Sequence, residues 1–91
     1  MTMKRNMKLI KEILLMIENE ETQKDAIFKK YSKKEVYYHN YLIYKAGLIE
    51  GNNHLLEKDA YHENWNFPII CPTIITWSGY DFLETIRDKD F

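Results

Sequence analysis

The chain has 91 residues, the length of one small domain with a single modest core. Hydrophobic residues make up 45% and charged residues 30%, which is ordinary for a globular protein and too apolar for a disordered chain. No apolar run approaches the ~18 residues of a membrane span, and the single cysteine, Cys71, excludes an internal disulfide. We therefore expect residues 1–91 to form one cytoplasmic domain that does not enter the membrane.

The net charge is −1, without the clear basic excess that many DNA-binding domains carry, and the charge is unevenly distributed. Residues 1–49 hold ten Lys/Arg and six Asp/Glu, a net of +4, whereas residues 50–91 hold three and eight, a net of −5. A nucleic acid would therefore meet one face of the domain, with the acidic half turned away.

The first predicted helix begins near the N-terminus and has apolar residues at three- and four-residue steps. This core stripe consists of Met3, Met7, Ile10, Ile13, Leu14 and Ile17. Leu9, Leu15 and Met16 fall outside the stripe, and two interpretations are open. They pack under other parts of the same domain, or they form a second helix-packing surface, as in a dimer.

A second helix is predicted over residues 33–46. Ser32 and Glu35 match the S-x-x-E capping box at its start, and Gly47 supplies the left-handed residue that commonly ends a helix. The preceding cluster Ala26-Ile27-Phe28 is too short for a period to decide between a brief strand and one helical turn, and a strand fits at least as well.

Two extended segments and a last helix follow. Residues 48–56 and 69–76 are predicted to pair as antiparallel strands, with a bulge or turn signal at residues 51–53. Pro72 makes the returning strand an edge strand or breaks it there. Thr76 is the expected cap of a helix over residues 77–88. Its expected apolar side consists of Tyr80, Leu83 and Ile86, broadened by Phe82.

This order predicts an α+β domain of the winged helix-turn-helix kind, with three helices and a small antiparallel sheet. The helix over residues 33–46 occupies the place of the recognition helix, and the long hairpin occupies the place of the wing. One departure is that residues 23–30 do not clearly supply the separate helix that usually precedes the recognition helix.

Three stretches resemble one protein family. They are Met3-Lys4-Arg5-Asn6-Met7 continuing to Ile17-Glu18, Tyr31-Ser32 through Ala46-Gly47-Leu48-Ile49, and Thr76-Trp77-Ser78-Gly79-Tyr80-Asp81-Phe82-Leu83 with Ile86-Arg87-Asp88. The family is domain of unknown function 2513, found in bacteria and their phages. Asn6 stands where the family usually has Asp, and Tyr80 where it often has His. The resemblance implies a winged-helix-like fold and a phage or prophage setting, and it carries over no catalytic residue.

The predicted second helix has an unusual outer face. At 100° per residue, its core side holds Val36, His39, Leu42, Ile43 and Ala46. The opposite side or its edges hold Lys33, Lys34, Tyr37, Asn40, Tyr41, Tyr44 and Lys45, with Lys30 just before the helix. Tyrosine favours interfaces, and lysine, tyrosine and asparagine suit contacts with phosphates and base edges. Three interpretations are open: the tyrosines cover other parts of the domain, they bind a protein, or they bind nucleic acid.

The long loop between the strands carries Tyr61, Trp65 and Phe67. Aromatic residues in a polar loop either fold back onto the core or anchor a partner, and folding back is the more frequent outcome. A wing tip is also free to vary without unfolding the domain, so the loop is a candidate for specificity.

Catalytic and cofactor motifs are absent from the sequence. We find no glycine-rich phosphate loop, no recognisable Ser/His/Asp arrangement and no paired-carboxylate motif, so we expect no enzyme and no cofactor. His39 is expected to be a core histidine bonded to a backbone group. His54, His62 and Cys71 have no spacing that matches a zinc site.

The leading functional hypothesis is a small phage-type DNA-binding or regulatory module that uses residues 33–46 and the wing. The alternative is an adaptor that binds a host or phage protein through the same tyrosine-rich face. A homodimer through the terminal helices is a further prediction, because a small core is unlikely to cover every off-stripe apolar residue.

Overall fold

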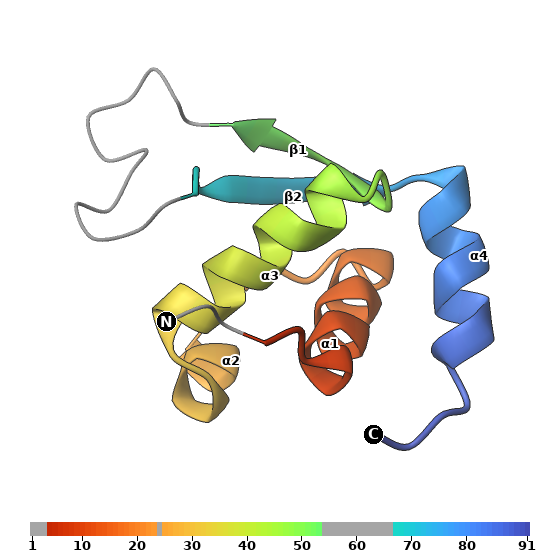
Figure 1. The fold of residues 1–91 in the computed structure, drawn as a ribbon, viewed down its shortest axis with the longest axis horizontal. Coiled ribbons are helices and arrows are strands. Elements are labelled where there is room, and N and C mark those ends of the chain that lie inside the picture. Colours follow the sequence, from red (N-terminus) through yellow and green to blue (C-terminus); the bar gives the residue numbers. More distant parts are fainter. Residues whose placement is uncertain (1–3, 24, 54–66) are drawn as a thin grey trace.

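The computed structural model describes residues 4–23, 25–53 and 67–91. In chain order the elements are α1 (Met7–Glu18), α2 (Asp25–Lys30), α3 (Lys33–Lys45), β1 (Ile49–Asn53), β2 (Ile70–Ile75) and α4 (Trp77–Ile86). The two strands lie over α3, and α2 and α4 lie toward opposite ends of the long axis (Figure 1). The α+β class is confirmed, but the described residues form four helices rather than the expected three. None of these helices is both long and apolar enough to cross a membrane.

The additional helix is α2, where the sequence fits a strand at least as well. Ile27 is buried in the main core, and Phe28 is partly buried and packs against that core. One helical turn thus places both apolar residues against the core. The Tyr31 amide donates to the Ile27 carbonyl at 3.0 Å and closes that turn. Three apolar residues carry no period, so packing between α1 and α3 decides the conformation. The structure thus corrects the strand interpretation and places a helix directly before α3.

Helix α3 begins and ends as the sequence predicts. The Ser32 hydroxyl accepts a hydrogen bond from the Glu35 amide at 3.1 Å, which satisfies a first-turn donor. At the other end Gly47 has φ +78°, its amide donates to Tyr44, and the Leu48 amide donates to Ile43. This pair of bonds is the Schellman arrangement, for which glycine is the favoured residue.

Helix α1 ends with the same pair of bonds but without a glycine. The Glu20 amide donates to Ile17, the Glu21 amide donates to Met16, and Glu20 has φ +57°. For a residue with a Cβ, this left-handed conformation costs about 1 kcal/mol or more. The helix therefore stops where the sequence lacks the usual stop signal.

The strands pair as predicted, over a shorter range. Ile49 pairs with Ile75, and beyond Glu50 the register shifts so that Gly51 faces Pro72. The shift leaves Thr73 as the extra residue, and its hydroxyl donates to the Glu50 carbonyl at 3.1 Å. Pro72 has no amide hydrogen for the ladder, so a bulge in an edge strand accommodates it.

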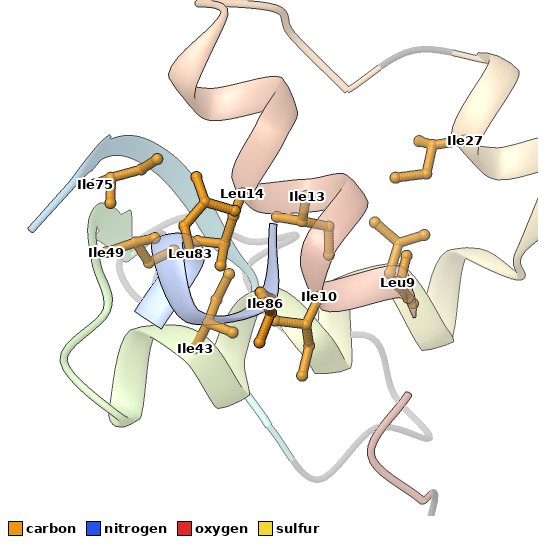
Figure 2. Packing of buried hydrophobic residues seen from close by; sticks show 11 residues of the cluster. Leu9, Ile10, Ile13, Leu14, Ile27, Ile43, Ile49, Ile75, Leu83 and Ile86 are labelled. Carbon is orange, nitrogen blue, oxygen red and sulfur yellow. The ribbon is translucent and has the colours of Figure 1, made fainter. Parts of the chain in front are cut away.

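The core is centred on α1. Leu9, Ile10, Ile13 and Leu14 project from this helix toward residues of α3, both strands and α4 (Figure 2). Leu9 is 0% exposed, as expected if the apolar residues outside the stripe pack under other parts of the same domain. Leu15 and Met16 are half-buried and pack against the same cluster. Because α1 is covered by α2 as well as by α3, its buried face is wider than one stripe.

Helix α4 is anchored at its first turn. The Thr76 hydroxyl accepts from the Gly79 amide at 3.0 Å and donates to the Gly47 carbonyl at 2.6 Å, so it caps α4 and ties it to the end of α3. Gly79 is buried, with Leu83 and Ile86 following on the same face. Tyr80 is 46% exposed, which corrects its expected place in the core. Close packing at Gly79 rotates Tyr80 to the edge of the buried face.

Candidate functional site

The predicted outer face of α3 is only partly exposed. Lys33 and Lys45 are exposed, whereas Lys34, Tyr37, Tyr41 and Tyr44 are half-buried. Four residues at successive spacings of four, three and four share the outward side of the helix, and none of them is fully buried. We call them the α3 stripe: Lys34, Tyr38, Tyr41 and Lys45.

Asn40 does not belong to the outer face. It is 0% exposed, and its amide makes two reciprocal hydrogen bonds with the Gln23 amide, at 2.8 Å and 3.0 Å. Its position four residues after Val36 and three before Ile43 already places it beside core residues. The sequence interpretation placed Asn40 on the outer side or its edges, and the hydrogen bonds with Gln23 offset the cost of burying its amide. This is a correction to the predicted binding residues.

His39 is buried beside Asn40 and links α3 to the start of α1. The Asn6 amide donates to His39 Nε2 at 2.8 Å, and His39 Nδ1 donates to the Glu35 carbonyl at 2.7 Å. An Nε2 that accepts and an Nδ1 that donates define one neutral tautomer. The predicted core histidine bonded to the backbone is therefore confirmed. Ala46, expected on the same side, is exposed because the helix ends there.

An aromatic cluster lies against the α3 stripe. Phe67 is 5% exposed, and its ring centroid lies 5.2 Å from that of Tyr38 and 6.0 Å from that of Tyr41. The expected folding back of the loop aromatics is thus confirmed for Phe67. Tyr61 and Trp65 lie outside the described residues. The cluster covers one flank of both tyrosines and leaves them half-buried.

Tyr37 faces a groove rather than the stripe. Its ring centroid lies 5.7 Å from that of Phe28, and the groove of about 290 Å³ also includes Cys71 and Pro72. Burial raises the pKa of the Tyr37 phenol, with a further contribution from Cys71. The phenol therefore stays protonated at neutral pH. Tyr44 packs against the core cluster, so neither residue is fully available to a partner.

The basic residues around the α2–α3 junction combine exposure with a contact to α1. Lys29, Lys30 and Lys33 are all exposed, and Lys30 also lies 3.1 Å from the Glu12 carboxylate. Burial, together with the neighbouring Glu12 carboxylate, raises the pKa of the Tyr31 phenol. Lys30 and Tyr31 thus link the α2–α3 junction to Glu12 of α1, and Lys30 keeps most of its side chain exposed.

Helix α4 presents the opposite charge. Asp81, Glu84 and Asp88 are exposed and lie three and four residues apart, so they form an acidic stripe. Arg87 binds Glu18 of α1 through both carboxylate oxygens, at 3.1 Å and 2.7 Å, and also reaches Glu84 at 3.1 Å. The hydrogen bonds from Arg87 lower the pKa of Glu18. The acidic residues therefore lie on a different helix from the α3 stripe (Figure 1).

Metal ligands do not gather anywhere in residues 4–23, 25–53 and 67–91, where no group of three His, Cys, Asp or Glu side chains could hold an ion. Cys71 is exposed, and His54 and His62 lie outside these ranges. The zinc hypothesis gains no further observation.

Comparison with known proteins places the chain in a family. An uncharacterized protein of Haemophilus influenzae is 30% identical over 90 residues, covering 94% of this chain and 70% of that protein. No solved structure matches. A family model described as a hypothetical protein (DUF2513) matches residues 4–91, nearly the whole chain. The chain therefore belongs to the domain of unknown function 2513 family.

Proposed function

We propose that this chain is a small cytoplasmic, phage- or prophage-type DNA-binding module of the winged-helix kind. In this proposal α2 and α3 form the helix-turn-helix pair, and β1 and β2 form the base of the wing. The element order supports it, since two helices joined through Tyr31 and Ser32 are followed directly by an antiparallel pair of strands. The helix at residues 25–30 supplies the element that the sequence did not clearly contain.

The observation that carries the proposal is the α3 stripe. Its two tyrosines lie between two lysines on the outward side of the helix, and Lys33 adds a third cation at the helix start. Lysines contact phosphates, and tyrosine hydroxyls donate to phosphate or sugar oxygens. The exposed carboxylates of α4 repel phosphate, so the duplex would approach the α3 side.

Salt-dependent binding tests this proposal. Electrophoretic shift assays with random and genomic duplexes should show affinity falling steeply between ~50 and ~200 mM salt. Replacing Lys34 and Lys45 with Gln should weaken binding to all sequences and lower the slope of log K against log salt by about one per lysine. Lys89→Gln is the matched control, because Lys89 is exposed beyond α4. Absence of a shifted complex at low salt, or equal loss in the control, contradicts DNA binding through α3.

A second candidate is an adaptor that binds a host or phage protein through the tyrosine-rich face without DNA. It is favoured by the aromatic cluster, in which Tyr38 and Tyr41 stay half-buried after packing on Phe67. Tyrosine is enriched in protein interfaces, and binding dominated by its ring depends little on salt. Under this alternative Tyr41→Ala weakens the complex and the lysine variants do not.

A homodimer through the terminal helices also stays a proposal. Leu9 cannot mark its surface, because Leu9→Glu would place a charge in the core. Light scattering of the wild-type chain across micromolar concentrations tests association directly, and a monomer at high concentration contradicts it.

A further inference from the structure

Three large apolar side chains are exposed where β2 passes into α4. Trp77 is 86% exposed, Ile74 is 54% exposed and Tyr80 is 46% exposed. Trp77 and Tyr80 are three residues apart on α4, so they are neighbours on one face of the helix. A tryptophan exposed to this degree gains almost nothing from folding, because its apolar area remains in water.

The packing of α4 accounts for its cap, its glycine and its buried leucine. It does not account for the exposed side chains of Ile74, Trp77 and Tyr80. Thr76 caps the helix, Gly79 lets it approach Leu48, and Leu83 enters the core. Each of these residues is needed to seat α4 on the rest of the domain. Trp77 lies between the cap and the glycine and points away from that contact. The packing of α4 on the domain therefore does not explain why Trp77 and Tyr80 are aromatic.

The charges beside the aromatic residues indicate the chemistry of a partner. Asp81 lies four residues after Trp77, and Glu84 lies four residues after Tyr80, so both carboxylates border the same face. Arg87 partly neutralises Glu84 at 3.1 Å, and its other contacts are with Glu18. Asp88 adds a further exposed negative charge one turn later. This face repels nucleic acid and attracts cations.

We propose that the exposed face of α4, formed by Trp77, Tyr80 and Asp81, docks a basic segment of another protein. The segment carries Lys or Arg next to an apolar residue. The indole of Trp77 binds the cation over its face, and Asp81 accepts a charge-assisted hydrogen bond from it. The apolar neighbour covers Tyr80. The face of one short helix is smaller than the roughly 800 Å² per partner of a standard interface, which suits a short segment.

This docking surface is separate from the α3 stripe and does not depend on the proposed DNA binding. Helix α4 lies at the far end of the long axis from α2 (Figure 1). A basic protein segment on α4 and a duplex on α3 would not compete for the same residues. The chain would then join two partners of opposite charge through faces of opposite charge.

Selection from a random peptide display library tests the partner chemistry. The wild-type chain is the bait, and peptides that also bind Trp77→Ala are removed; this variant should fold because Trp77 contributes little to packing. We expect the remaining peptides to carry net positive charge and at least one apolar residue. Enrichment of acidic or uncharged peptides, or no enrichment that depends on Trp77, would overturn the proposal.

Fluorescence then measures the binding of a selected peptide. In a Trp65→Phe background Trp77 is the single tryptophan, and its emission should shift to shorter wavelength as the peptide covers the indole. Asp81→Lys should weaken binding at least tenfold, whereas Asp90→Lys, the same charge change beyond α4, should leave it nearly unchanged. Equal effects of the two variants would contradict a specific site. Self-association that is lost in Trp77→Ala would show that a second copy is the occupant, and the proposal would be wrong.

Discussion

Helices α3 and α4 begin alike and are held in place differently. Each starts with a hydroxyl cap, Ser32 or Thr76, that accepts from the amide three residues later. The buried face of α3 includes the polar pair His39 and Asn40, both hydrogen bonded to residues before α1 or α2. The buried face of α4 is a glycine followed by aliphatic residues. The buried face of α3 is thus oriented partly by hydrogen bonds, whereas the buried face of α4 is oriented by close packing.

The difference has a consequence for the two outward faces. Hydrogen bonds fix the rotation of α3 about its axis, because Asn40 and His39 have partners in only one orientation. The α3 stripe is therefore presented at a defined angle. In α4 the rotation is fixed by one close backbone contact at Gly79, which turns Trp77 and Tyr80 outward. Removing the hydrogen bonds of His39 and Asn40 should disturb the α3 stripe. Removing the close contact at Gly79 should disturb the outward face of α4.

The largest effect is expected from Gly79→Ala. A Cβ at this position would lie 1.9 Å from the Leu48 carbonyl oxygen and 2.6 Å from Ile75 Cγ2, so α4 must move away. The alanine gains about 1 kcal/mol of helix propensity, but we expect a net loss of about 3 kcal/mol in the free energy of unfolding. Urea denaturation monitored by circular dichroism measures it.

Ser78→Ala is the control for this prediction, since Ser78 is the exposed neighbour in the same helical turn. Its effect should stay within about 0.5 kcal/mol. A Gly79→Ala protein as stable as the control would show that the close contact between Gly79 and Leu48 does not hold α4 in place. The proposed difference between the packing of α3 and that of α4 would then be wrong.

A smaller effect is expected from the polar contact that holds α3. Asn40→Ala leaves the Gln23 amide without its two hydrogen bonds and should cost about 2 kcal/mol. Gln23→Ala likewise removes the two hydrogen bonds that the buried Asn40 amide makes with the Gln23 side chain. Because the two side chains bond to each other, the double variant should cost less than the sum of the single variants, by about 1 kcal/mol. Strict additivity in this cycle would mean that the pair does not act as a unit.

Much of this architecture follows from local signals in the sequence. The caps at Ser32 and Thr76, the stop at Gly47, and the bulge near Pro72 lie where residue chemistry places them. Each depends on one residue and its immediate neighbours, so no knowledge of distant packing is needed. The α+β class follows because these signals divide the chain into its elements.

The errors arose where distant packing decides. The segment at residues 25–30, which the sequence left open between a strand and a helical turn, is a helix whose Ile27 is buried in the core. Asn40 was assigned to the outer side or its edges, although its spacing from Val36 and Ile43 places it beside the core. The sequence does not show that Tyr37, Tyr41 and Tyr44 are half-buried, because their exposure depends on distant packing, and their role in binding stays a prediction.

The smallest effect concerns the ion pair that ties the end of α4 to α1. The hydrogen bonds from Arg87 lower the pKa of Glu18 below its ordinary value of 4.5. A carboxylate with a lowered pKa in the folded state stabilises that state at pH above 4.5, and this contribution disappears as the pH falls through the folded-state pKa.

Arg87→Gln should therefore lower Tm at pH 7, and its difference from wild type should shrink as the pH falls below 4.5. Glu84→Gln keeps the Glu18 contact and should retain the wild-type pH profile, since Glu84 is largely exposed. Thermal unfolding between pH 3 and 7, followed by circular dichroism, measures this difference. A difference between wild type and Arg87→Gln that is independent of pH would show that Arg87 acts through packing and not through its charge.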